Sequence, residues 1–176
     1  MLAITVTGFL TWFLVTAKIL PFTAATCIGV SVVCAVGCGV LYHFQGKNGI
    51  DCFPSGKVNL IYGEEILFFI FFLMWTYFAG FRPQAYGTEK FMDYGFMEAM
   101  MRSTTLPARD LWYSEGTINY YYGGQYFAVF LTKLTGSKVE LTYNLMRTFV
   151  AAFAFVLPFS LVHQMTLDMQ GRVSGW

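Results

Sequence analysis

The sequence predicts an all-α fold, a polytopic bundle of about five transmembrane helices. The chain has 176 residues, of which 56% are hydrophobic and only 12% are charged, against about 25% charged in an average soluble protein. The mean hydropathy is +0.54, and the apolar residues gather in long runs separated by polar stretches. The formal net charge is +1, with no basic stripe, so we expect no nucleic-acid partner.

The first two apolar runs, residues 2–17 and 22–44, predict an N-terminal transmembrane hairpin over residues 1–44. Lys18 and Pro21 separate the runs, and each run is proposed to cross a hydrocarbon core about 30 Å thick. No positively charged region leads the N-terminus, so the first run is interpreted as a retained helix. Small residues in the second run favour close helix packing. The chain has four cysteines. Cys27, Cys34 and Cys38 lie in the second run and are expected to pack as small hydrophobes, and Cys52 lies outside it.

A solvent-side loop is predicted over 45–63, because Gly, Asn, Pro and Ser are frequent there. The third span is expected over 64–81. Glu64 and Glu65 would open this helix and complement its dipole, and aromatic side chains near its end would lie at the membrane interface.

Two further spans are expected in the last third of the chain. The fourth covers 118–135, the short turn 136–144 follows, and the fifth covers about 145–165 with Pro158 inside it. Proline kinks or locally opens a helix but is tolerated in membranes. The polar tail closes no further element, so we expect residues 64–176 to be the truncated start of a larger membrane module.

The loop over residues 82–117 is rich in both charged and aromatic side chains. An amphipathic surface helix is predicted over 89–103, with Thr88 as its N-cap. Its apolar face has helical spacing, and an ion pair is expected one turn apart on its polar side. The apolar face consists of Met92, Phe96, Ala99 and Met100, and the ion pair of Glu98 and Arg102.

Two carboxylates, Glu89 and Asp93, lie one turn apart at the start of this helix. At that spacing they can share a proton, bind a cation or supply a general base. The alternative is a solvated helix start whose acids only complement the dipole. A divalent metal would suit the pair, but the chain offers no complete ligand set.

The polar and aromatic residues that follow are candidates for binding a substrate. A tyrosine has a flat apolar face and a hydroxyl group, which suits stacking on a sugar and hydrogen bonding to a phosphate. The same chemistry suits an interfacial aromatic belt, and consecutive helical residues point about 100° apart, so at most two of the three tyrosines would face one ligand. These candidates are Asp110, Trp112, Asn119, Tyr120, Tyr121 and Tyr122.

The segments EKFMDYGFMEAMMRS, LPARDLWYSEGTINYYYGGQYF and FLTKLTG resemble the signature of the YYY-type polytopic membrane proteins of bacteria and archaea. The order of features is also similar to that of the GT-C membrane glycosyltransferases. In that group an acidic motif follows a membrane helix in the first large extracytoplasmic loop. Here Glu89 and Asp93 take the acidic position, although they are separated rather than adjacent.

The resemblance implies an enzyme of a prokaryotic cell membrane that moves a sugar from a polyprenyl-phosphate donor to an acceptor outside the cytoplasm. Asp93, more firmly within the helix than Glu89, would be the general base. Arg82 or Arg109 would bind the lipid phosphate, or else lie at the interface and pair with acids. The alternative is a non-catalytic transporter or scaffold component. Ionisable residues are almost absent between the ends of the second, third and fifth expected spans, apart from His163, which disfavours an ion pathway.

Overall fold

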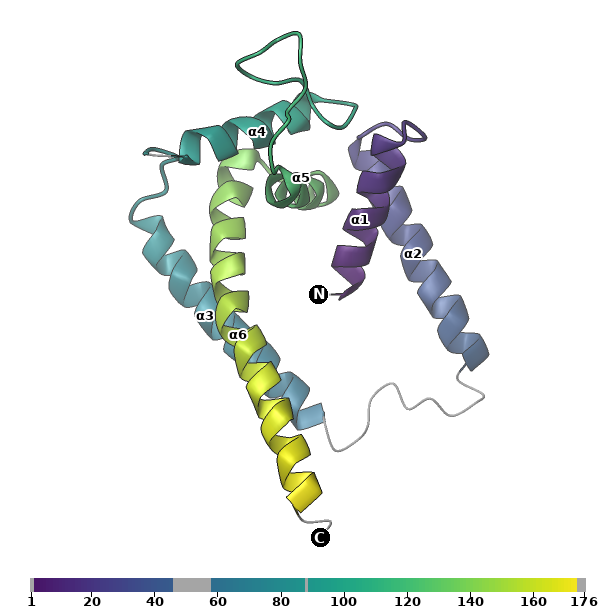
Figure 1. Ribbon diagram of the computed structural model, residues 1–176, viewed down its shortest axis with the longest axis vertical. Helices are drawn as coiled ribbons and strands as arrows, with labels where there is room; N and C mark the ends of the chain where they lie inside the picture. Colours follow the sequence, from purple (N-terminus) through teal and green to yellow (C-terminus); the bar gives the residue numbers. More distant parts are fainter. Residues whose placement is uncertain (1, 46–57, 88, 174–176) are drawn as a thin grey trace. The chain divides into compact units, whose positions relative to one another are not determined.

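The computed structural model describes residues 2–45, 58–87 and 89–173. Within these ranges all regular elements are helices (Figure 1), which confirms the all-α prediction. In chain order they are α1 (Leu2–Thr16), α2 (Ala24–Gln45), α3 (Val58–Gly80), α4 (Lys90–Arg102), α5 (Gly123–Thr135) and α6 (Val139–Val173).

Three of the described helices are long and apolar enough to cross a membrane. Their candidate spans are Ala24–Phe44, Leu60–Gly80 and Val139–Leu167. The predicted total of about five spans is not confirmed, because α1 has 15 residues and α5 has 13. At 1.5 Å per residue α5 is about 20 Å long, shorter than a hydrocarbon core of about 30 Å. Residues 118–122, predicted as the start of the fourth span, lie outside any helix.

Helix α3 includes residues that we predicted as loop. Its described part begins at Val58 and has no acidic residue in the first turn, so the prediction that Glu64 and Glu65 open the helix is wrong. Residues 46–57 of the predicted loop lie outside the described residues. The apolar residues before Glu64 extend the helix, and the two acids therefore lie within the candidate span Leu60–Gly80.

Helix α6 is also longer than the predicted fifth span, with 35 residues. It begins at Val139, so the predicted turn over 136–144 shrinks to the three positions before the helix. Pro158 lies inside the helix, and the helix continues on both sides of it. A proline removes one backbone donor, which a long helix with many other backbone bonds tolerates.

The turn between α5 and α6 depends on Gly136. This residue caps α5 in the left-handed conformation, with φ at 67°, and a side chain is disfavoured there. We expect Gly136→Ala to lower the free energy of unfolding by about 1–2 kcal/mol, measured by thermal unfolding in mild detergent. Gly124→Ala is the matched control, because Gly124 lies in a helix with open space around it. An equal loss in both variants would contradict the role of backbone conformation.

The described residues form two compact units. The first comes from Met1–Ile50 and Gln84–Tyr143, and the second from Asp51–Pro83 and Asn144–Trp176. In the second unit, α3 meets α6 through aromatic side chains. The ring centroids of Phe68 and Phe153 are 4.6 Å apart, and those of Phe71 and Phe155 are 4.4 Å apart. Thr76 Oγ1 also donates to Thr148 Oγ1 at 3.1 Å.

The core of the first unit joins α1, α2, α4 and α5. Its most buried side chains include Phe22, Met100 and Phe130. The hydroxyl of Tyr126 donates to the carbonyl oxygen of Gly8 at 2.8 Å. This bond ties α5 to α1, and burial raises the pKa of Tyr126 above its ordinary value.

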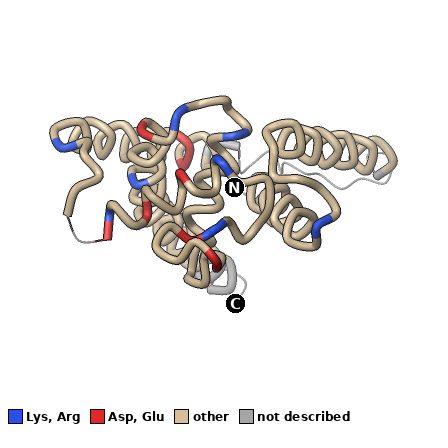
Figure 2. The backbone as a smooth tube through the Cα atoms, turned by 90° about the horizontal axis from the view of Figure 1, so that it is seen from above, with Lys and Arg blue, Asp and Glu red and all other residues tan. Residues whose placement is uncertain are grey.

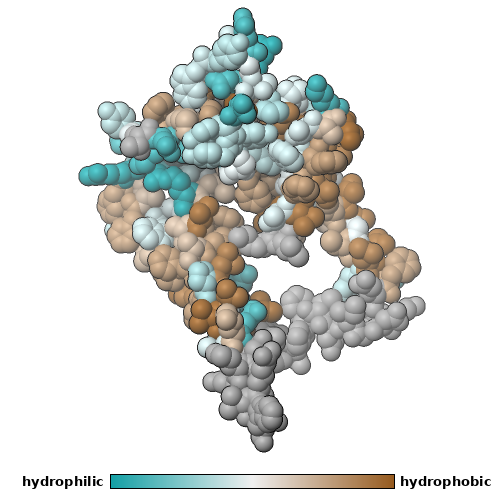
Figure 3. All heavy atoms as spheres, viewed as in Figure 1, coloured by the Kyte–Doolittle hydropathy of each residue, from teal (hydrophilic) through white to brown (hydrophobic). Residues whose placement is uncertain are grey.

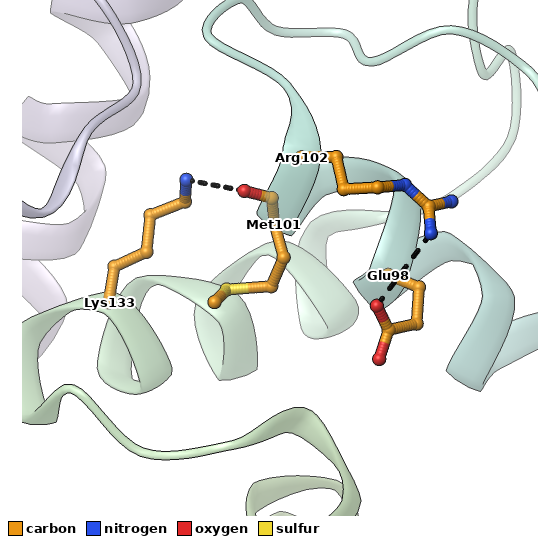
Figure 4. A network of polar contacts seen from close by, with 4 residues as sticks. All are labelled: Glu98, Met101, Arg102 and Lys133. Carbon is orange, nitrogen blue, oxygen red and sulfur yellow. Dashed lines mark hydrogen bonds and ion pairs between the residues drawn. The ribbon is translucent and has the colours of Figure 1, made fainter.

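Lys133 is a buried cation in the same core. Its Nζ donates to the carbonyl oxygens of Phe22 and Met101, both at 3.0 Å, and lies 4.5 Å from the centroid of the Phe22 ring. Figure 4 shows the bond to Met101. Burial lowers the pKa of Lys133, because desolvation disfavours the charged form. One side chain therefore connects α5, the segment before α2 and the last turn of α4.

Large apolar side chains are exposed along the long helices. Val33 on α2 is 71% exposed, Leu73 on α3 is 62% exposed, and Leu161 on α6 is 61% exposed. Hydrophobic residues cover much of these helices, whereas hydrophilic residues gather over α4 and its following loop (Figure 3). Few residues along the described backbone are charged (Figure 2). Apolar surface of this extent is typical of a membrane or an interaction site, and helices of spanning length make a membrane the fitting environment.

Candidate functional site

The candidate site is built on α4, which forms where the surface helix was predicted. Glu89 is its N-cap residue and makes no side-chain capping bond; the predicted cap, Thr88, lies outside the described residues. Phe96, Ala99 and Met100 are buried as expected, together with Met97, whereas Met92 of the predicted apolar face is only half-buried. These residues pack inside the first unit, where α4 meets α5. The location of α4 on a membrane surface stays a prediction.

The predicted ion pair on α4 is confirmed. Nη1 of Arg102 lies 3.9 Å from Oε2 of Glu98, as Figure 4 shows. The Arg102 side chain is 67% exposed, so the pair contributes little to stability. Arg102 thus remains at the surface, where it can meet a ligand.

Asp93 is half-buried and held by a residue that the sequence did not single out. Nε2 of Gln125 donates to Oδ1 of Asp93 at 2.7 Å, which joins α4 to the first turn of α5. Glu89 is exposed. A signal for Gln125 exists in the sequence, because it is a polar residue directly before the apolar run of α5. Its partner across the fold could not be read from spacing.

Two of the three tyrosines come together beside these acids. The Tyr120 hydroxyl donates to the Tyr121 hydroxyl at 2.6 Å, and the ring centroids are 3.9 Å apart. That hydrogen bond, followed by desolvation and by the charges of Tyr121, Glu89 and Asp93, raises the pKa of Tyr120 to about 12. Tyr120 is therefore protonated at neutral pH and lies within the electrostatic reach of both carboxylates.

Tyr122 takes a different place from its two neighbours. Its hydroxyl accepts a hydrogen bond from Nε1 of Trp12 on α1 at 3.3 Å. The residue is the N-cap of α5. Tyr122 thus supports the fold of the first unit.

An aromatic group continues from the tyrosine pair along α4. The ring centroids of Phe96 and Tyr120 are 6.2 Å apart, and Trp112 lies edge-on to Phe96 at 5.7 Å and to Phe91 at 6.4 Å. Trp112 is exposed. We call the set of Glu89, Asp93, Trp112, Tyr120 and Tyr121 the acid–aromatic cluster. Exposed ring faces beside carboxylates suit a ligand with both apolar faces and hydroxyl groups.

Asp110 shapes the loop that positions Trp112. Its Oδ1 accepts hydrogen bonds from the backbone N–H groups of Trp112 at 2.8 Å and Tyr113 at 3.1 Å. An isolated antiparallel bridge pairs Arg109 with Thr117 at the base of the loop. The geometry therefore gives the Asp110 carboxylate a structural role in an Asx-type turn. Asn119, the remaining polar candidate, is exposed just before the tyrosines.

Arg109 lies in a separate polar pocket of about 400 Å³. Arg102 and the hydroxyl residues Ser103, Thr104 and Thr105 also line it. At about 100° per residue, Arg102 and Asp93 lie roughly 180° apart around α4. The structure thus separates this arginine pocket from the Asp93 carboxylate. Arg82, the other predicted phosphate ligand, belongs to the second unit.

A divalent metal was considered for Glu89 and Asp93, which lie four residues apart. In the described part of the chain no group of three or more His, Cys, Asp or Glu residues forms a potential metal site. The side chains of the acid–aromatic cluster can themselves transfer protons and form hydrogen bonds.

Comparison with known proteins places the chain among membrane proteins. A family model described as "Uncharacterized membrane protein (DUF2298)" matches residues 6–175. No curated protein and no solved structure matches the chain. The family description states a membrane location and no activity, so the chemistry must be argued from the site.

Proposed function

From the premise that the chain belongs to the DUF2298 family of uncharacterized membrane proteins, we propose that this integral membrane protein is a glycosyltransferase-like enzyme. Its donor is a sugar linked to a polyprenyl phosphate, and its acceptor is met at the extracytoplasmic face of a prokaryotic cell membrane. The resemblance of residues 82–144 to YYY-type proteins and to GT-C enzymes supports this assignment of reaction class.

One observation carries the proposal: Asp93 is held beside exposed aromatic faces. The bond from Gln125 to Oδ1 is 2.7 Å long and fixes the carboxylate, while the exposed Tyr120 ring packs against Phe96, which lies about one helical turn from Asp93. A sugar ring can stack on such faces and place its hydroxyl groups near the carboxylate. A fixed carboxylate is also what a general base requires, because positioning precedes proton transfer.

The reaction forms one bond and breaks one. The acceptor hydroxyl oxygen attacks the anomeric carbon of the donor sugar, and the bond from that carbon to the phosphate oxygen breaks. The acceptor proton passes to the Asp93 carboxylate, and we assign Oδ2 to this transfer because Oδ1 binds Gln125. The phosphate leaves on the polyprenyl carrier with the bonding electron pair.

The carrier phosphate has two candidate arginines. Arg109 shares its pocket with Arg102 and three hydroxyl residues, and guanidinium groups bind phosphate oxygens bidentately. Because this pocket and Asp93 lie on different sides of α4, Arg109 suits the anchoring of a lipid phosphate better than contact with the reacting bond. Arg82 is the second candidate, and binding measurements can separate the two.

The test uses protein purified in mild detergent and a polyprenyl-phosphate-linked sugar with a radiolabel in the sugar. We expect native mass spectrometry to show a bound polyprenyl phosphate, and chromatography to show labelled product with release of the carrier. Arg109→Ala and Arg82→Ala are compared. Replacement of the arginine that binds the phosphate should weaken carrier binding at least tenfold. Bulk phospholipid alone on every variant, with an untouched donor, would instead support a non-catalytic membrane component.

A further inference from the structure

The second unit contains a cavity that the acid–aromatic cluster does not use. Its volume is about 500 Å³, and α3 and α6 both line it. The walls are almost entirely apolar, with Leu67 and Phe71 from α3 and Phe155 and Phe159 from α6. The exception is Glu64, which contributes the cavity's only ionisable side chain among the described residues.

Glu64 is an unusual residue for its position. It lies within the candidate span Leu60–Gly80, and its Oε1 is buried without a hydrogen-bond partner among the described residues. The helix-dipole explanation does not apply, because α3 has no acid in its first turn. A carboxylate oxygen that is buried without a donor costs free energy, and acids within membrane spans generally mark a functional site.

The rings beside Glu64 favour a positively charged ligand. Phe71 and Phe155 stack on each other, with an interplanar angle of 6° and centroids 4.4 Å apart, so a ligand can meet only their edges and outer faces. Phe159, further along α6, is 48% exposed and lines the same cavity. The faces of aromatic rings attract cations, and a carboxylate does so by its charge. Both kinds of group in one apolar cavity select a molecule that is bulky, apolar and cationic.

We propose that the Glu64 cavity binds a lipophilic organic cation. The apolar body of the ligand would fill the cavity that α3 and α6 line, and its positive charge would be neutralised by the Glu64 carboxylate. The charge of this ligand would compensate the buried carboxylate oxygen, whereas an acyl chain would supply neither a charge nor a donor. The site is independent of the glycosyltransferase proposal, since none of the residues that line the cavity has a role in that proposal.

The test measures binding of tetraphenylphosphonium to the purified full chain in detergent by equilibrium dialysis. Glu64→Gln retains the size of the side chain and removes its charge, and we expect it to weaken binding at least tenfold. Glu65→Gln is the matched control, because Glu65 is the next residue on the same helix but is exposed; its binding should stay within twofold of wild type. The neutral probe triphenylphosphine oxide should bind wild type at least tenfold more weakly than the cation.

A second variant tests the rings if Glu64→Gln proves unstable. Phe155→Leu keeps the cavity apolar but removes one aromatic face, so it should weaken binding of the cation severalfold and leave the neutral probe unchanged. The proposal fails if wild type does not bind tetraphenylphosphonium, if the two glutamine variants bind it equally, or if the neutral probe binds as well as the cation.

Discussion

Asp93→Asn should lower the rate of sugar transfer by about 10²–10⁴-fold, the range typical of losing a general base, while the protein stays folded. Asparagine has nearly the same shape, and its Oδ1 can still accept the hydrogen bond from Gln125, which is 2.7 Å long in the native protein. The change therefore removes the proton acceptor and keeps the tie between α4 and α5. The measurement is kcat with the labelled lipid-linked donor, together with a thermal unfolding curve.

Glu89→Gln is the control for Asp93→Asn. Glu89 is also a carboxylate of the acid–aromatic cluster, but it is exposed at the N-cap of α4, so we expect a loss of less than about tenfold, below the usual contribution of a general base. If both variants lose activity equally, the pair acts as a unit and the assignment of the base to Asp93 is wrong. Full activity of Asp93→Asn would remove the base from the mechanism altogether.

Lys133→Met should lower the free energy of unfolding by about 2–6 kcal/mol, because it leaves two buried carbonyl acceptors without a donor at about 1–3 kcal/mol each. The two acceptors, on Phe22 and Met101, each lie 3.0 Å from Nζ. Methionine fills most of the same apolar volume, so the loss reports hydrogen bonding more than packing. Thermal or denaturant unfolding in detergent, followed by tryptophan fluorescence, measures it.

The pH dependence of this effect gives a second readout. Burial lowers the pKa of Lys133 in the folded protein, so above that lowered pKa the unfolded chain binds more protons than the folded one. Stability of wild type relative to Lys133→Met should therefore rise with pH through the window between the lowered pKa and the ordinary lysine value, and this gain is lost as pH falls. Lys138→Met, at an exposed lysine, should change neither quantity. A pH-independent difference between wild type and Lys133→Met would contradict the buried cation.

Local patterns were sufficient to predict much of the helix content. The apolar run over 22–44 became α2, and the spacing of Phe96, Ala99 and Met100 correctly predicted the buried face of α4. One prediction of a helix boundary failed because polar residues inside a helix were taken as its start. Glu64 was treated as a boundary, although α3 continues through it. The predicted fourth span was also too long, because its polar first residues, 118–122, lie outside α5.

The candidate site was less predictable, since its key contacts join distant parts of the chain. Asp93 was selected from its spacing to Glu89, but its partner Gln125 comes from another helix. Asp110 was predicted to bind substrate, and the sequence did not indicate that its Oδ1 also holds its own loop. The separation of Arg109 from Asp93 depends on where the loop after α4 closes, and the bridge from Arg109 to Thr117 that closes it has no signal in the sequence.

The hydrogen bonds from α1 to the start of α5 have a practical consequence. Trp12 binds Tyr122, and the carbonyl of Gly8 binds Tyr126, while Tyr122 directly follows the Tyr120–Tyr121 pair in the chain. Helix α1 thus helps to hold the tyrosines in position, and it is not a membrane anchor that can be removed without effect on them. A shortened expression variant that starts at α2 would lose both bonds, and a fusion partner intended to aid purification is better placed at the other end of the chain.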